Sequence, residues 1–161
     1  MRRLTVLLLT LLATLALIVA ACGDDDDDGG NGDDGGDDGG SSIAVTLQEF
    51  NVIPDASSAD AGEVTFEVEN VGPDDPHELV VMKTDLAADA LPTGEDGAVL
   101  EDGEGVELID EVEELEVGDT GTLTVNLEAG SYVLLCNLVE EEDGELESHY
   151  QEGMRTAFTV N

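Results

Sequence analysis

Hydrophobic and polar residues alternate in several short segments between residue 43 and the end of the chain. Turn-forming Gly, Pro, Asn and Asp residues separate these segments, as is typical of short β-strands. The positions predicted to face a common core are Ile43, Val45, Leu47, Val64, Phe66, Val68, His77, Leu79, Val81, Leu123, Val125, Leu127, Tyr132, Leu134, Cys136, Phe158 and Val160. Polar residues between them indicate antiparallel strands whose outer faces contact water. We therefore predict an all-β fold, a Greek-key antiparallel β-sandwich, over residues 43–161.

The stretch from residue 84 to 117 is less regular. Its second half is very acidic, and within it Val106, Leu108 and Ile109 form a short apolar stripe that suits a helix or a strand. We expect a long excursion between the two halves of the sandwich.

The first 22 residues are not expected to belong to the fold. A basic Met1-Arg2-Arg3 precedes an uncharged, largely apolar run that ends in two alanines and Cys22. This arrangement is typical of an export signal, and specifically of a bacterial lipobox in which Cys22 is lipidated and becomes the mature N-terminus. An uncleaved transmembrane anchor is the alternative, because about 18 apolar residues are nearly enough to span a bilayer. Both interpretations place the domain at the extracytoplasmic face of a membrane, attached to it.

Residues 23–42 consist of Asp, Gly and Ser with one Asn and no apolar residue. Such a segment cannot bury hydrophobic surface, and its like charges repel, so we predict a disordered linker. It lacks the spaced oxygen ligands of a calcium-binding loop.

The net charge is −36, from 40 acidic and only four basic residues. Nucleic-acid binding requires a basic surface and is therefore excluded. The acidic surface favours basic protein partners and resembles that of proteins from salty habitats, where screening relieves self-repulsion. We expect a monomer with no catalytic activity, because the neighbouring Ser148 and His149 do not by themselves form a Ser–His–acid triad.

Rare residues gather near the C-terminus. Cys136, His149 and Met154 lie within 19 residues, and the remaining histidine, His77, opens an upstream strand. If Cys22 is lipidated, Cys136 is a lone exported thiol, and metal binding or intermolecular pairing would explain it. Strand ends from distant parts of a Greek-key sandwich meet at one pole, so these four side chains are predicted to form one metal site. Sulfur and imidazole ligands select copper or zinc, and two His, one Cys and a weak axial Met favour blue copper over zinc.

The same residues carry a resemblance to the cupredoxins, the family of plastocyanin, azurin and the sulfocyanins. The matching motifs are Asn70-x-Gly-x-x-x-Pro-His77-Glu-Leu-Val-Val, Gly130-x-Tyr-x-x-x-Cys136-Asn and His149-Tyr-x-x-Gly-Met154. The resemblance covers residues 43–161 and implies a single-copper electron carrier with a redox donor and a redox acceptor. It also implies that the ring edge of His149 reaches the surface and passes the electron.

One feature departs from most small members of the family. Twelve residues, several of them acidic, separate Cys136 from His149, where a few are usual. This insertion is predicted to alter the pole at which a partner would dock. Glu78 and Asn137 lie next to predicted ligands and are candidates for supporting contacts. A copper-delivery module and a metal-free sandwich that binds another protein are the competing functional hypotheses.

Overall fold

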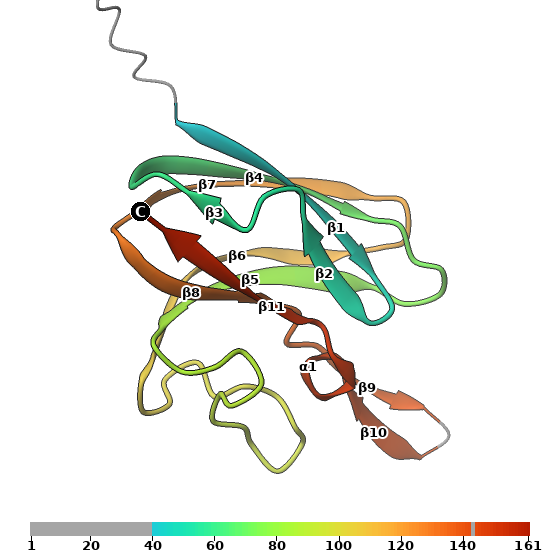
Figure 1. Ribbon diagram of the computed structural model, residues 1–161. Coiled ribbons are helices and arrows are strands. Elements are labelled where there is room, and N and C mark those ends of the chain that lie inside the picture. The colour runs from blue at the N-terminus through green and yellow to red at the C-terminus, as the bar shows by residue number, and fades with distance from the viewer. Residues whose placement is uncertain (1–39, 143) are drawn as a thin grey trace, which may run out of the picture. The chain divides into compact units, whose positions relative to one another are not determined.

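The computed structural model describes residues 40–142 and 144–161, which form two packed β-sheets (Figure 1). The first sheet has the order β2-β1-β4-β7 and the second has the order β3-β11-β8-β5-β6. The strands of the first sheet are β1 (Ser41–Gln48), β2 (Asn51–Pro54), β4 (Gly62–Asn70) and β7 (Thr120–Leu127). Those of the second are β3 (Ser58–Ala59), β5 (His77–Thr84), β6 (Val106–Leu115), β8 (Gly130–Leu135) and β11 (Arg155–Val160). A separate hairpin of β9 (Val139–Glu142) and β10 (Glu145–Ser148) leads into the short helix α1 (His149–Glu152).

The predicted alternation is confirmed in the core between the sheets. Nearly every predicted inward position is buried in one continuous cluster, and Val125 is partly buried against it. Phe66 of β4 and Phe158 of β11 meet edge to face across the core, with ring centroids 5.7 Å apart. This geometry is favoured between aromatic rings and links the two sheets directly.

Two strand pairs correct the prediction of a purely antiparallel sandwich. β1 pairs with β4 in parallel, and β11 pairs with β3 in parallel. Between β1 and β4 the chain turns back through β2 and crosses to the edge of the second sheet at β3, so β4 enters beside β1 from the same end. The other strand pairs of the two sheets are antiparallel.

The alternation predicted that the outer face of the second sheet contacts water, and this is wrong for its central strands β5 and β8. Val80 and Met82 of β5 and Val133 and Leu135 of β8 point away from the main core, and all four are buried. The irregular chain between β5 and β6 spans residues 85–105 and is shorter than the predicted excursion of residues 84–117, because Val106–Leu115 form β6. This segment, which we call the excursion from here on, covers the four side chains and contributes buried side chains of its own. Figure 1 shows this excursion as the yellow-green loops beside the second sheet. These two strands are therefore packed on both faces.

The apolar stripe predicted at Val106, Leu108 and Ile109 belongs to β6, which is ten residues long and pairs with β5. The register shifts twice along this pair, once between Val81 and Met82. Such bulges interrupt strict alternation, which explains why the stripe did not indicate a strand unambiguously.

The described chain begins just before β1, and the last two residues of the predicted linker, Ser41 and Ser42, belong to that strand. The predicted export signal with Cys22 and the rest of the linker lie outside the described residues. Within the described part, no helix is both long and apolar enough to cross a membrane.

Candidate metal centre

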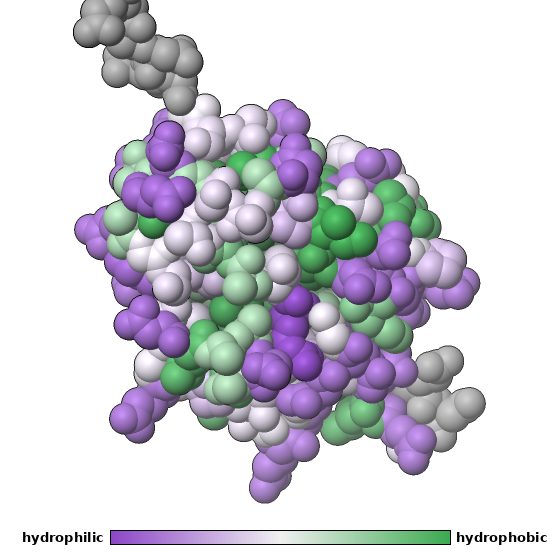
Figure 2. All heavy atoms as spheres, viewed as in Figure 1, coloured by the Kyte–Doolittle hydropathy of each residue, from purple (hydrophilic) through white to green (hydrophobic). Residues whose placement is uncertain are grey.

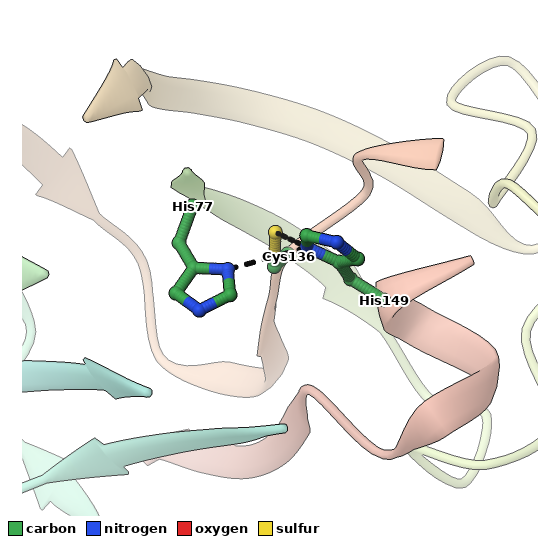
Figure 3. Close-up of side chains that lie close together, drawn as sticks. All are labelled: His77, Cys136 and His149. Carbon is green, nitrogen blue, oxygen red and sulfur yellow. Dashed lines mark hydrogen bonds between the residues drawn. The ribbon is translucent and has the colours of Figure 1, made fainter. Parts of the chain in front are cut away.

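Three of the predicted ligands meet at one pole of the sandwich. The Nδ1 atoms of His77 and His149 are 3.2 Å apart, and the Sγ atom of Cys136 is 3.3 Å from Nδ1 of His149. Figure 3 shows the two rings and the sulfur turned toward one another. All three residues are fully buried. Cys136 and His149 lie 59 and 72 residues after His77 in the sequence, yet the three side chains meet in one small volume.

A hydrogen-bonded turn places His77. Asn70 is buried at the end of β4, and its Nδ2 donates to the carbonyl oxygens of Asp75 and Leu115, both at 2.9 Å. Its Oδ1 accepts the N–H of Gly72 at 2.8 Å. Gly72 has φ +66°, and a Cβ there would lie 2.7 Å from the side chain of Val117, so a larger residue would be strained. The Asn-x-Gly pattern thus fixes the loop that delivers His77 to β5.

Cys136 follows the last residue of β8 and continues its inward direction. Its backbone N–H donates to the carbonyl of Met154, and its Sγ accepts the N–H of Glu78 at 3.5 Å. Burial raises the pKa of the thiol to about 12. A thiolate is therefore stable at this position only when a positive charge compensates for the lost hydration.

His149 opens α1, whose four residues are capped at both ends. Ser148 Oγ accepts the N–H of Gln151, and Gly153 closes the turn at φ +125°. The next residue, Met154, is buried, and its N–H donates to the carbonyl of His149 at 2.9 Å. The backbone thus ties Met154 to both Cys136 and His149, while its part as a fourth ligand stays a prediction.

The ring of His149 does not reach the surface, which corrects the expectation from the family resemblance. Phe50 packs against it edge to face, with centroids 5.3 Å apart. The hairpin formed by β9 and β10 brings Glu140 to its other nitrogen, with 3.5 Å between Nε2 and Oε2. His77 has a similar neighbour, because its Nε2 lies 3.5 Å from Oε1 of Glu49. Burial and the nearby His149 both lower the pKa of His77, so the metal-free ring is held neutral.

The excursion is attached to the residues that flank the ligands. Asn137 accepts the N–H of Val99 and donates to its carbonyl, at 2.6 and 3.1 Å. Ser148 Oγ donates to the carbonyl of Gly97 at 2.9 Å. The hydroxyl of Tyr150 accepts the N–H of Leu91 and donates to the carbonyl of Ala88. Through these hydrogen bonds the excursion holds residues that lie next to the predicted ligands, a role that the sequence did not reveal.

Both candidates for supporting contacts lie beside the site. Besides donating its N–H to Cys136, Glu78 accepts the backbone N–H of Asn137 at 3.0 Å through Oε1. Sequence reasoning missed Glu49, Glu140 and Phe50. The sequence has 40 acidic residues, and no signal in it marks Glu49 and Glu140 as the ones that face the imidazoles.

The donor set can hold a metal ion. Atoms that share one ion at about 2.0–2.3 Å lie about 3–4 Å apart, and the separations of 3.2 and 3.3 Å agree with that spacing. One thiolate and two imidazoles suit copper, with zinc as the alternative. Ligand atoms of Asp75, Glu147 and His149 also lie within 4.8 Å of one another and form a second group with ligand-type side chains.

Two solved structures have a fold similar to that of this chain. Auracyanin from Roseiflexus castenholzii, in its dithionite-reduced form, is 21% identical, and the alignment covers 75% of this chain and 97% of that chain, with a TM-score of 0.51. Auracyanin A from Chloroflexus aurantiacus, described as a blue copper protein, is 23% identical over 76% of this chain and 100% of that chain, also with a TM-score of 0.51. These similarities confirm the predicted cupredoxin fold.

Comparison with protein-family models and with curated protein sequences gave no match. The relationship is therefore visible in the arrangement of strands and not in overall sequence similarity.

Proposed function

We propose that this protein holds one copper ion through His77, Cys136, His149 and Met154 and carries single electrons between a redox donor and a redox acceptor. The observation that carries the proposal is the buried group of two imidazoles and one thiol, in which Nδ1 of His149 lies 3.2 Å from Nδ1 of His77 and 3.3 Å from Sγ of Cys136. The cupredoxin fold and the blue copper character of auracyanin A support copper over zinc.

When bound, copper would supply a one-electron change between Cu(II) and Cu(I), for which thiolate and imidazole ligands are suited. The chain supplies the fixed geometry. His77 is held by its strand and by the Asn70 turn. Cys136 is held by the hydrogen bond from its backbone N–H to the carbonyl of Met154, and His149 is held by a capped helix. The N–H of Glu78 stabilises negative charge on the sulfur. Because these groups are buried and already in place, little rearrangement is needed when an electron arrives or leaves.

Charge and location set the choice of partner. Figure 2 shows hydrophilic side chains over much of one face, with smaller hydrophobic areas between them. The excess of acidic residues would speed encounters with basic redox proteins at low ionic strength. Lipidation at Cys22 would attach the domain to the extracytoplasmic face of the membrane and confine this exchange to its surface.

Cu(II) added to the purified full-length protein in detergent tests the proposal. We expect intense visible absorption from thiolate-to-copper charge transfer and a reversible one-electron voltammetric wave. Cys136→Ser should abolish both, whereas Cys22→Ser should retain both, because Cys22 lies outside the predicted domain of residues 43–161. A colourless, redox-silent and folded protein would contradict the copper carrier.

The same experiment separates the competing hypotheses. A copper-delivery module would exchange its metal rapidly and give a poorly reversible wave. A metal-free sandwich would lose stability in Cys136→Ser without any change in metal content. Mass spectrometry of the membrane-bound protein separates the two N-terminal hypotheses, because a lipidated Cys22 at the N-terminus is expected and a chain that still begins at Met1 would favour an uncleaved anchor.

A further inference from the structure

Each imidazole of the metal centre has a carboxylate at its outward nitrogen. Nε2 of His77 lies 3.5 Å from Oε1 of Glu49, and Nε2 of His149 lies 3.5 Å from Oε2 of Glu140. Both Nε2 atoms are buried, and within the described chain neither has a hydrogen-bond partner at normal distance. The two rings thus share one arrangement, although their carboxylates come from unrelated parts of the chain.

The proton on each ring is determined by which nitrogen binds the metal. The two Nδ1 atoms face Cys136 and each other, so they are the atoms available to a shared ion. A neutral imidazole that binds metal through Nδ1 carries its proton on Nε2. A buried N–H then requires an acceptor, and a carboxylate oxygen already faces each one.

On the basis of the proposed copper site, we propose that Glu49 and Glu140 are positioning residues that accept hydrogen bonds from Nε2–H of His77 and His149 and lower the reduction potential of the copper. A carboxylate partner fixes the orientation of the ring and makes it a stronger electron donor to the metal. Its negative charge also favours Cu(II) over the less positive Cu(I). Both effects act in the same direction.

Glu49 is held firmly in this position. Its Oε1 accepts the backbone N–H groups of Asp74 and Asp75 at 3.0 and 2.7 Å, and its side chain is only 12% exposed. Glu49 thus connects the loop before His77 to the ring of His77.

Glu140 is held less firmly. Its side chain is 37% exposed and belongs to the hairpin inserted between Cys136 and His149. Solvent screens a charge at that exposure more strongly, so Glu140 should influence the potential less than Glu49 does.

A second cation site at His149 is the rival arrangement. Asp75, Glu140, Glu141 and Glu147 line a pocket of about 210 Å³, and Asp75 and Glu147 are grouped with His149. A cation bound to Nε2 of His149 would leave no N–H for Glu140. The two arrangements exclude one another, and metal stoichiometry distinguishes them.

Midpoint potentials of the copper-loaded full-length protein test the inference. We expect Glu49→Gln to shift the Cu(I)/Cu(II) ratio at a fixed applied potential toward Cu(I) by about tenfold, which is about 59 mV for one electron. Glu140→Gln should shift it in the same direction by several-fold. Glu141→Gln is the matched control, because it removes one charge from the same hairpin, and its shift should be smaller than that of Glu140→Gln. Glu140→Asp keeps the charge but shortens the side chain, so it should reproduce part of the Glu140→Gln shift.

Proton–nitrogen NMR of the diamagnetic Cu(I) protein gives a second readout. We expect a slowly exchanging Nε2–H signal from each histidine, with only the signal of His149 lost in Glu140→Ala, which removes the acceptor oxygen. Equal potential shifts in Glu140→Gln and Glu141→Gln would overturn the inference, as would a second Zn²⁺ equivalent bound through Nε2 of His149. Absence of visible absorption in the unaltered protein would instead overturn the proposed function, and this inference with it.

Discussion

The excursion and the β9–β10 hairpin are both inserted next to the metal centre, yet they differ in what they bury. The excursion places Leu91 and Val99 in a hydrophobic cluster, where they are 6% and 3% exposed. The hairpin leaves its Leu146 61% exposed. The excursion also bonds to Asn137, Ser148 and Tyr150, whereas the hairpin contributes a partly exposed carboxylate beside His149.

This difference shows that an insertion near a site can act in two ways. The excursion completes the packing of a sheet and stabilises the segments that carry ligands. The hairpin forms its own antiparallel pairs and changes the surroundings of one ligand at little cost to the core. Stability should therefore depend on the excursion, and redox properties should depend on the hairpin.

The same substitution in both insertions gives the largest expected contrast. Leu91→Ala should lower the free energy of unfolding by about 2–5 kcal/mol, because it leaves a cavity in the outer cluster. Leu146→Ala should change it by no more than about 0.5 kcal/mol, because the side chain is exposed. Urea unfolding of the metal-free proteins measures both, and similar losses would show that the two insertions do not differ in this way.

The hydroxyl of Tyr150 tests the link between the excursion and α1. Tyr150→Phe keeps the buried ring but leaves the N–H of Leu91 without its acceptor and the carbonyl of Ala88 without its donor. We expect a loss of about 1–3 kcal/mol in unfolding free energy, since buried polar groups without partners are costly. Faster amide hydrogen exchange at Leu91 than in the unaltered protein would locate the effect, and unchanged exchange would contradict it.

The pH dependence of stability tests the contact between Glu78 and Asn137, in which the side chain of Glu78 accepts the backbone N–H of Asn137. Burial raises the pKa of Glu78 from 4.5 to about 7, and the N–H of Asn137 offsets only part of this rise. Between these pH values the folded protein keeps a proton that the unfolded chain has lost, so stability falls as pH rises from about 4.5 to 7.

Glu78→Gln removes that contribution while retaining an acceptor oxygen for Asn137. From pH 5 to pH 8 the metal-free variant should lose less stability than the unaltered protein in urea titrations. Glu113→Gln removes an exposed carboxylate from β6 and serves as the control. Equal losses in all three proteins would refute this role of Glu78.

A shortened hairpin should have the smallest effect on stability. Glu141 pairs with Leu146, and Glu142 pairs with Glu145, so deleting these four residues leaves the Glu140–Glu147 pair joined by an Asp-Gly turn. We expect unchanged visible absorption, an unfolding free energy within about 0.5 kcal/mol, and faster electron exchange with small soluble oxidants. Stopped-flow kinetics would measure the rate, and a slower or equal rate would show that the hairpin does not restrict access.

The sequence predicted the core strands well because their alternation reflects burial on one face. It predicted wrongly that the outer face of β5 and β8 contacts water, although the sequence contained a signal of burial. Leu79 to Met82 and Tyr132 to Cys136 are continuous apolar runs, which indicate strands buried on both sides. When these runs are interpreted as alternating segments, the outer face of β5 and β8 is expected to contact water. The packing of the excursion against that face was therefore not predicted.

The ligand group could be predicted because His, Cys and Met are rare in this chain and fall at strand ends. Glu49 and Glu140 could not, because their selection depends on the tertiary positions of two loops. The burial of His149 likewise depends on Phe50, which is distant in sequence, and on a hairpin whose acidic residues do not favour a strand locally.

The pairing of Val139 with Ser148 at the base of the hairpin has an engineering consequence. The inserted segment leaves and re-enters the domain at neighbouring positions, so its tip can be exchanged without separating Cys136 from His149. Foreign peptides grafted between Glu141 and Leu146 would be displayed on the same hairpin as Glu140, which lies beside His149. The domain could then serve as a scaffold in which the grafted peptide selects the docking partner while the rest of the domain remains the same.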